Sequence, residues 1–434
     1  MSRPLLHWQA AVLAALLLVP PVAAQTRDVR IDVRSDAVRR ISVHCESLDP
    51  TGDRQARSWS VQADEVLATD LEQSAVFMAT RAWTGAEPAP DVQAVVGGRW
   101  EVRGDQVRLT GEVRDVPARR PILIKEYRGP LREWRSLAHA FADDIVQQFT
   151  GEPGVASTRI AFVVKEGKAK ELHVMDHDGA GLQRLTSDGS IALSPAWSPE
   201  GSLLLFTSYR EGGGPRIYVM PASGGKTFLV SGRPGNNTTP AYSPDGGWIA
   251  ATLSVDGNPE IYRMDARGRS PMRLTTNRSI DTSPVWSPTG QEIAFTSDRG
   301  GAPQVYLMDR EGGNVRRLTF DVTYTDSPAW SPKGVRIAFV ARTGGGFDIY
   351  TCRTDGSDLR LVVSGGSNEN PRWSPDARHL VFASNRDGTQ GIWVTDLDGR
   401  PPRKLNTGGR EALSPAWSPR VVTVQSAENV PIGP

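Results

Sequence analysis

Short runs of alternating hydrophobic and polar residues dominate the chain from residue 159 onward. Around Trp286 the runs are SPVWS, EIAFTS, QVYLMD and VRRLT, and the same four-part order recurs through this region. The two middle runs are rich in Ile, Val, Phe, Tyr and Thr, which favour a pleated and half-buried strand. The pattern therefore predicts a repeating unit of four β-strands.

Six near-copies of one motif, typified by SPAWSP, mark these repeats. Their central aromatic residues lie 45, 44, 44, 43 and 44 positions apart and are Trp197, Tyr242, Trp286, Trp330, Trp373 and Trp417. A period in the forties made of four strands is typical of a β-propeller blade. Turns such as Ser243-Pro244-Asp245-Gly246 have the proline and glycine positions of a type I turn. We expect the first proline of each motif, Pro195 and its equivalents, to begin a strand, where a missing N–H does least harm.

The two ends of the array are unequal. Three strand-sized runs at 159–164, 171–176 and 183–186 precede the first motif, whereas the array ends with a single motif strand around 412–418. Pairing that last strand with the first three completes a sixth blade and removes two open sheet edges. We therefore predict an all-β, six-bladed propeller over residues 159–420, closed by its C-terminal strand.

The residues before the propeller predict an export signal and a small α/β domain. Residues 1–24 contain one basic residue, an apolar run at 10–19 and a small-residue cleavage site, so the mature protein is expected to begin near Gln25. The apolar run is too short for a spanning helix, which disfavours an uncleaved anchor. Strands and two helices, at 63–74 and 131–148, predict a multidomain chain with an α/β domain at 25–150, a linker at 151–158 and a tail at 421–434.

Charge balance and cysteine content narrow the choice of partners. The chain has 50 basic and 49 acidic residues, so no excess of positive charge directs it to nucleic acid or anionic lipid. The two cysteines, Cys45 and Cys352, fall in different predicted domains. We expect two buried free thiols, because a disulfide between domains would need a fortuitous geometry.

Candidate catalytic and metal-binding groups are sparse. His173 and His177 lack an HExxH motif, a cysteine pair or a third ligand nearby in sequence, so a structural role is favoured. A peptidase-related propeller would need a G-x-S-x-G nucleophile elbow, which the sequence does not contain. A periplasmic small-molecule-binding propeller would need a ligand-sized pocket, which a sequence does not locate. We expect no catalytic residue, no metal and no cofactor. The peptidase-related propeller and the small-molecule-binding propeller are the two alternatives to this non-catalytic interpretation.

The motif order and two further segments resemble the TolB family, the periplasmic propellers of the Tol-Pal envelope system. The segment DLEQSAVF at 70–77 resembles the family's helix-to-strand passage, and the run from Ala140 through Phe149-Thr150-Gly151 to 158–161 resembles its helix, linker and first propeller strand. The resemblance implies a monomeric, non-catalytic adaptor in the periplasm, without membrane insertion. Such an adaptor links inner-membrane TolA to the outer-membrane lipoprotein Pal, maintains envelope integrity and supports outer-membrane constriction at cell division.

The same resemblance implies two partner sites. A TolA-like protein is expected to bind the N-terminal segment, which consists of Thr26, Arg27, Asp28, Val29, Arg30, Ile31, Asp32 and Val33. The run after it, Arg39-Arg40-Ile41-Ser42-Val43, departs from the family's arginine-proline-isoleucine passage because it has no proline. A Pal-like lipoprotein is expected at the mouth of the propeller, beside Asn236, Asn237, Thr238 and Thr239.

The mouth is also predicted from propeller geometry. Loops from each fourth strand to the next first strand share one end of the channel with the second-to-third loops, and they vary beside a fixed motif. Further candidates on these loops are Asp281, Thr282, Thr325, Asp326, Asn368 and Glu369. The second-to-third loops repeat an arginine, at Arg210, Arg299, Arg342 and Arg386, and four guanidinium groups could receive an acidic partner segment. Two simpler interpretations stay open: ordinary solvated loops, and arginines that pair between blades.

Overall fold

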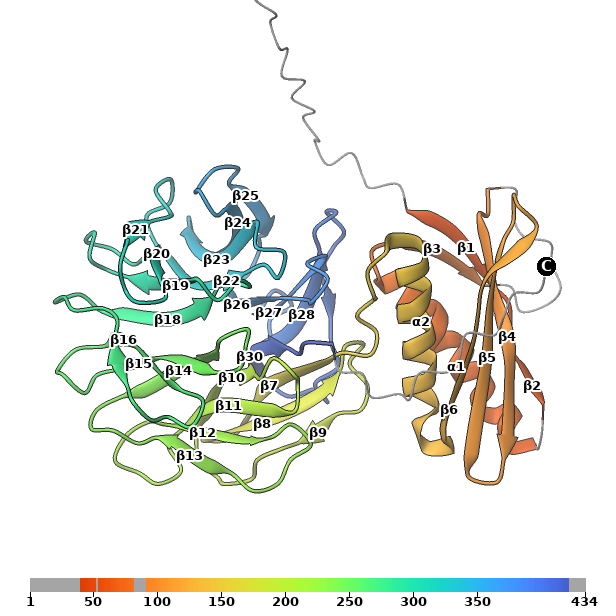
Figure 1. Cartoon of the computed structure of the whole chain (residues 1–434), viewed down its shortest axis with the longest axis horizontal. Helices are drawn as coiled ribbons and strands as arrows, with labels where there is room; N and C mark the ends of the chain where they lie inside the picture. Colours follow the sequence, from red (N-terminus) through yellow and green to blue (C-terminus); the bar gives the residue numbers. More distant parts are fainter. Residues whose placement is uncertain (1–39, 52–53, 82–90, 421–434) are drawn as a thin grey trace, which may run out of the picture. The chain divides into compact units, whose positions relative to one another are not determined.

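The computed structural model describes residues 40–51, 54–81 and 91–420 of the chain (Figure 1). The expected signal peptide at 1–24, the N-terminal segment at 26–33 and the tail at 421–434 lie outside these residues. None of the described helices is long and apolar enough to cross a membrane.

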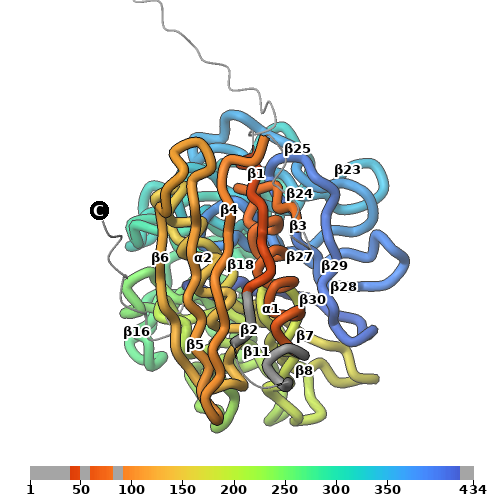
Figure 2. Tube along the Cα trace, turned by 90° about the vertical axis from the view of Figure 1, so that its right-hand side faces the viewer, coloured from red at the N-terminus to blue at the C-terminus, as the bar shows by residue number. Residues whose placement is uncertain are grey.

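A mixed sheet and two helices form the N-terminal part of the structure. The strand order is β3-β1-β4-β5-β6, in which β1 is parallel to β3 and β4, and β4, β5 and β6 are long antiparallel neighbours (Figure 2). The elements are β1 (Ile41–Cys45), β2 (Asp49–Thr51), α1 (Arg54–Gln73), β3 (Phe77–Arg81), β4 (Ala94–Arg103), β5 (Gln106–Asp115), β6 (Arg120–Pro130), the 3₁₀ helix η1 (Leu131–Glu133) and α2 (Trp134–Thr150). Helix α1 therefore begins well before the predicted residue 63. The prediction missed the first turns of the helix because they are mostly polar and carry no clear apolar stripe.

Both helices share one apolar core with this sheet. Leu71 of α1, Trp100 of β4 and Phe141 of α2 are fully buried in it. The ring of Phe141 lies against the backbone of Gly111 on β5, where a Cβ atom would stand 2.4 Å from the ring, so only glycine fits at this position. Gly151 ends α2 in the left-handed conformation with φ 76°.

Six four-stranded antiparallel sheets follow, each a blade of the propeller. In blade order they are β10 (Ala192–Trp197), β11 (Leu203–Ser208), β12 (Arg216–Pro221), β13 (Phe228–Ser231); β14 (Asn237–Tyr242), β15 (Trp248–Leu253), β16 (Glu260–Asp265), β17 (Met272–Arg273); β18 (Asp281–Trp286), β19 (Glu292–Ser297), β20 (Gln304–Asp309), β21 (Arg316–Arg317); β22 (Thr325–Trp330), β23 (Arg336–Thr343), β24 (Gly346–Arg353), β25 (Arg360–Val363); β26 (Asn368–Trp373), β27 (His379–Ser384), β28 (Gly391–Asp396), β29 (Arg403–Lys404); and β30 (Ala412–Trp417), β7 (Arg159–Glu166), β8 (Ala169–Asp176), β9 (Gln183–Arg184).

The sixth blade combines the two ends of the array, as predicted. Strand β30 pairs antiparallel with β7, and Ala412 faces Val164 while Trp417 faces Ile160 (Figure 1). Ser418 N donates to Arg159 O at 2.8 Å and Ser418 Oγ accepts from Arg159 N at 2.9 Å. The first strands β10, β14, β18, β22, β26 and β30 contact one another in a closed ring. The predicted fold class is therefore confirmed.

The first proline of the motif lies in a bulge within the strand. In all six blades the pairing of the first strand shifts register at this point. The residue ahead of the proline has a positive φ between 47° and 56°; these residues are Ser194, Thr239, Ser283, Ser327, Asn370 and Ser414. The prediction that the proline begins the strand is wrong, because the bulge leaves its position without a ladder hydrogen bond, and proline is tolerated there too.

Three of the motif tryptophans connect neighbouring blades. The indole N–H of Trp197 donates to Ala416 O at 2.9 Å, that of Trp286 to Ala241 O at 3.2 Å, and that of Trp373 to Ala329 O at 3.0 Å. In each pair the acceptor belongs to the first strand of the preceding blade, one residue after its motif proline. These three tryptophans therefore hold the inner strands of adjacent blades together, whereas the indole of Trp330 donates to Gly334 O of its own blade and that of Trp417 to Thr158 Oγ1, next to β7.

Candidate partner-binding site

One mouth of the channel is built from the starts of the first strands and the neighbouring second-to-third loops. Asn237 N donates to Pro215 O at 3.2 Å, and Asp281 N donates to Pro259 O at 3.0 Å. Each of these bonds ties the start of a first strand to the second-to-third loop of the blade before it. We call these strand starts and second-to-third loops the rim. It contains the predicted candidates Asn236, Asn237, Thr238, Thr239, Asp281, Thr282, Thr325, Asp326, Asn368 and Glu369.

Four of the candidate residues are buried and hold the rim together. Asn237, Asp281, Thr325 and Asn368 are at most 1% exposed. The side chain of Asn237 accepts from Ser231 Oγ at 2.6 Å and donates to Arg233 O at 2.8 Å. These four residues begin the first strands of their blades. Their side chains therefore fix the loops from inside instead of facing solvent.

The remaining loop candidates reach solvent. Asn236 and Glu369 are exposed, whereas Thr238, Thr239, Thr282 and Asp326 are half-buried. Thr239 Oγ1 lies 2.8 Å from Thr252 Oγ1, and Asp326 Oδ1 accepts from Thr296 Oγ1 at 2.8 Å. A partner at the rim would consequently meet Asn236 and Glu369 first.

Three of the four rim arginines are bound within their own blades. Arg299 donates to Asp281 Oδ2 at 2.8 Å and lies over Phe295 and Tyr306, with its guanidinium carbon 5.2 and 5.0 Å from the ring centroids. Arg386 donates to Asn368 Oδ1 at 2.8 Å and covers two rings of its blade in the same way. Arg210 pairs with Asp188 at 2.7 Å, on the loop that leads into its own blade.

These three arginines therefore brace their second-to-third loops against the first strand of the same blade or the loop that leads into it, and this pairing differs from the pairing between blades that the sequence suggested. Arg342, in contrast, lies within strand β23 and not on the second-to-third loop predicted for it, and its side chain is exposed. Sequence reasoning found the repeat of arginines but not their partners, because Asp281 and Asn368 are far from them along the chain.

The N-terminal sheet and helices contact the opposite end of the blades. Arg40 Nη2 lies 2.9 Å from Asp396 Oδ2 and also pairs with Asp398, and Arg400 pairs with Glu72 of α1 at 2.8 Å. Asp396, Asp398 and Arg400 belong to the third-to-fourth turn of the blade β26–β29. Third-to-fourth turns lie at the far end of the blades from the second-to-third loops. In the described part of the chain, these contacts leave the rim uncovered.

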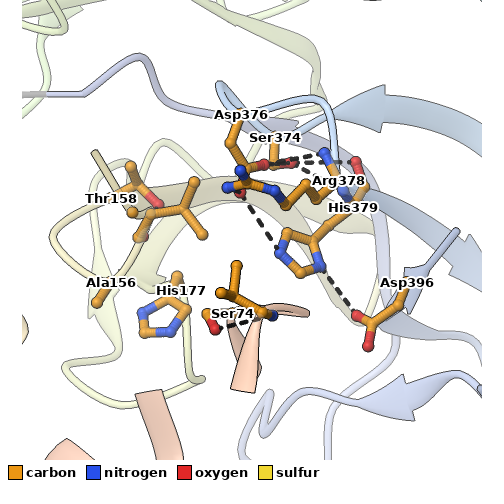
Figure 3. Close-up of polar contacts among 12 residues, drawn as sticks. Ser74, Ala156, Thr158, His177, Ser374, Asp376, Arg378, His379 and Asp396 are labelled. Carbon is orange, nitrogen blue, oxygen red and sulfur yellow. Dashed lines mark hydrogen bonds and ion pairs between the residues drawn. The ribbon is translucent and has the colours of Figure 1, made fainter. Parts of the chain in front are cut away.

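His379 at the start of β27 anchors this contact from inside the propeller. Its Nδ1 lies 2.9 Å from Asp396 Oδ1, the carboxylate that also receives Arg40 (Figure 3). Asp376 in turn accepts from Ser374 Oγ at 2.5 Å and lies 3.7 Å from His379 Nε2. Both the histidine and Asp376 are almost fully buried. A chain of polar groups thus runs from the motif serine of one blade to the N-terminal sheet.

A buried acid and two histidines meet at the same end of the blades. Asp70 of α1 accepts from or donates to His139 Nδ1 of α2 at 2.6 Å, and its other oxygen lies 3.5 Å from His177 Nε2 on the turn after β8. Sequence reasoning missed this group, because only His177 was a candidate and its neighbours come from two distant helices. The three side chains offer ligand-type atoms within 4.8 Å of one another. The separation of 2.6 Å between Oδ2 and Nδ1 leaves no room for an ion between those two atoms, and it fits a shared proton.

The charges in this group have defined directions. Burial lowers the pKa of His139, but the charge and hydrogen bond of Asp70 outweigh it and raise the pKa to about 9. Burial raises the pKa of Asp70. Both shifts favour a proton on the pair. Burial instead lowers the pKa of His177, so that this ring is neutral at neutral pH.

Comparisons with known proteins agree with this architecture. The Tol-Pal system protein TolB of Anaeromyxobacter dehalogenans is 36% identical over 265 residues, which are 57% of this chain and 60% of that protein. The TolB homolog of Chlorobium chlorochromatii is 40% identical over 154 residues, 36% of this chain and 34% of that protein. The matches thus span less than two thirds of these relatives. The crystal structure of TolB from Acinetobacter baumannii superposes with a TM-score of 0.78 at 28% identity, covering 88% of this chain and 97% of that one.

A family profile covers the whole propeller and extends slightly beyond it. The family described as the TolB beta propeller domain matches residues 146–421. The match contains all six blades and the helix end that leads into them. The chain therefore belongs to the TolB β-propeller family, as the resemblance of its motifs indicated.

Proposed function

We propose that this chain is a non-catalytic periplasmic adaptor of a Tol-Pal system, which binds a Pal-like outer-membrane lipoprotein at the rim and a TolA-like inner-membrane protein through its N-terminal segment. In this role it maintains envelope integrity and supports outer-membrane constriction at division. Relatives that carry the name Tol-Pal system protein TolB support the assignment to this system. The observation that carries the rim site is that the N-terminal elements contact the opposite ends of the blades.

The rim has the properties of a rigid docking surface. Buried Asn237 and Asn368 hold its loops, and Arg299 and Arg386 brace them against aromatic rings. A surface that is already ordered loses little conformational entropy when a partner binds, so more of the contact energy appears as affinity. Exposed polar groups such as Asn236 and Glu369 suit a partner that is itself soluble when unbound.

Substitution at the two ends of the propeller tests the rim site. Asn236→Arg places a long cation on the exposed rim, whereas Gln291→Arg makes the same amide-to-arginine change on an exposed turn between β18 and β19 at the other end. We expect the first change to weaken binding to the periplasmic domain of the organism's Pal-like lipoprotein at least tenfold in calorimetry, and the second to leave it unaltered. Equal effects of both variants, or no effect of Asn236→Arg and of Glu369→Lys, would contradict the proposal.

The N-terminal segment is tested separately. The resemblance to the TolB family supports residues 26–33 as the TolA-like site, and these residues lie outside the described structure. A mature chain that lacks residues 25–33 is expected to lose binding to the TolA-like protein and to retain lipoprotein binding. Retained binding to the TolA-like protein would show that its site lies elsewhere on the chain.

A further inference from the structure

The first strands of the six blades enclose a cavity of about 410 Å³ in the channel of the propeller. Its lining consists of the repeated motifs, from the residue ahead of the first proline to the second proline. Those second prolines, such as Pro199 and Pro375, precede the first-to-second turns, so the cavity lies toward the end of the blades opposite the rim.

One position of the motif differs sharply among the blades. The residue after the first proline lines the cavity in every blade, and we call this the ring position; its six occupants are Ala196, Ala241, Val285, Ala329, Arg372 and Ala416. Five of them are small and apolar. Among all the described residues that line the cavity, Arg372 is the single charged one.

The guanidinium of Arg372 has donors to spare. Its Nη1 donates to Pro371 O at 2.8 Å, which uses one of five N–H groups. Asp326 is the acidic neighbour that most favours its charge, but this carboxylate already accepts from Thr296 Oγ1 at 2.8 Å and from Ser327 N at 2.5 Å. Burial lowers the pKa of Arg372 to about 10, so the group is still a cation at neutral pH. By its solvent-accessible surface Arg372 is half-buried. Protein surrounds it on all sides except that of the cavity, and the exposed part of its surface faces the cavity.

A cation in such a place favours a small anion. A guanidinium presents paired N–H donors in the plane that a carboxylate matches with two parallel hydrogen bonds, and such bonds are the strong ones. The rest of the lining, with Trp197, Trp286 and the ring-position alanines, offers apolar surface for the body of a ligand. A single charge in the lining matches a monoanion, because a second negative charge would be buried without a partner.

We propose that the propeller channel is a binding site for a small organic monocarboxylate, whose carboxylate pairs with Arg372 and whose apolar part lies against the motif tryptophans. The cavity volume falls within the range of small-molecule pockets, at its lower end. The residues that carry the site, Arg372 and the motif tryptophans, belong neither to the rim nor to the N-terminal segment, and Thr239 is the rim candidate that also lines the cavity.

Benzoate is a suitable probe because it combines one carboxylate with a flat apolar body, and benzamide has the same shape without the charge. We expect saturable binding of benzoate to the purified full-length mature protein in calorimetry or ligand-observed NMR, and none of benzamide at the same concentration. Arg372→Ala installs the residue that four other blades carry, so it is expected to fold, and it should weaken benzoate binding at least tenfold. The matched control Arg267→Ala changes an exposed arginine on a third-to-fourth turn and should bind benzoate as the wild type does.

A second variant protects the test against a folding defect. Ala241→Leu keeps the charge of Arg372 and fills part of the cavity, so it should reduce benzoate binding while chloride still reaches the arginine. Failure of benzoate to bind at millimolar concentration would overturn the proposal. Undiminished binding to Arg372→Ala or to Ala241→Leu would do the same, as would competition by chloride at concentrations equal to those of benzoate, which would reveal a simple ion site.

Discussion

The proton shared by Asp70 and His139 makes the stability of this protein depend on pH, and His139→Gln should remove the contribution of His139 to that dependence. His139 is 4% and Asp70 3% exposed, and their side chains meet at 2.6 Å. The charge of Asp70 raises the pKa of His139 from 6.5 to about 9 against the effect of burial. Other charged or titratable groups around the pair are His177, Asp143, Asp176, Asp178, Arg135 and Arg403.

The sign of the effect follows from these two pKa values. Below pH 6.5 the imidazole of His139 is protonated in both the folded and the unfolded chain, so the contribution is complete. Between pH 6.5 and about 9 the folded protein holds a proton that the unfolded chain has lost, so stability falls as the pH rises. The corresponding change in the free energy of unfolding is about 3 kcal/mol over this interval. His177 acts in the opposite direction, since its lowered pKa costs stability when the pH falls below 6.5.

Urea unfolding followed by tryptophan fluorescence at pH 6.5 and pH 9 measures this contribution. Wild type should lose about 3 kcal/mol between the two pH values, whereas His139→Gln should be less stable than wild type at pH 6.5 by about 3 kcal/mol and nearly unchanged at pH 9. His44→Gln is the matched control, since the ring of His44 on β1 faces Thr80 Oγ1 at 3.3 Å, and it should keep the wild-type slope. If His139→Gln keeps the wild-type slope, the shared proton is not its source.

Three further predictions concern the ring and the thiols. Removal of residues 411–434 deletes β30 and should abolish cooperative folding of the propeller; a soluble truncation with a sharp thermal transition would refute the closure. Trp373→Phe removes the buried N–H that reaches Ala329 O at 3.0 Å and should cost about 1–2 kcal/mol in urea, whereas Trp330→Phe, whose indole reaches Gly334 O of its own blade at 3.4 Å, should cost less. Cys45 and Cys352 are buried free thiols, and burial raises the pKa of each to about 12, so neither should react with a thiol reagent at pH 8 before urea is added; rapid labelling in the native state would contradict this.

The sequence predicts the propeller well because its evidence is repeated. Six aromatic residues at a nearly constant spacing report both the number of blades and the strand that must close the ring, since a lone strand such as β30 has to find a partner. The sequence did not predict the bulge at Pro195, because proline fits a strand start and a bulge equally well.

The sites were harder to predict because each depends on residues that are distant along the chain. Asp70, His139 and His177 come from two helices and a blade turn, and none carries a motif that announces the others. The sequence also did not predict which of these residues are buried. Asn236 and Asn237 are neighbours in a polar segment, yet Asn237 is 1% exposed and Asn236 faces solvent. Arg372 lies inside a motif copy, at the position where four other copies have alanine. The sequence does not show that this position faces the channel, so it did not single out Arg372 as a candidate.

Site-specific photo-crosslinking in the cell envelope tests the adaptor account most directly. One variant carries a photoreactive amino acid at position 236 on the rim, and a second carries it at position 291 at the opposite end of the blades. Both positions are exposed to solvent. The account predicts that position 236 crosslinks to a Pal-like outer-membrane lipoprotein and that position 291 does not. A crosslink to the lipoprotein from position 291 alone would contradict the account.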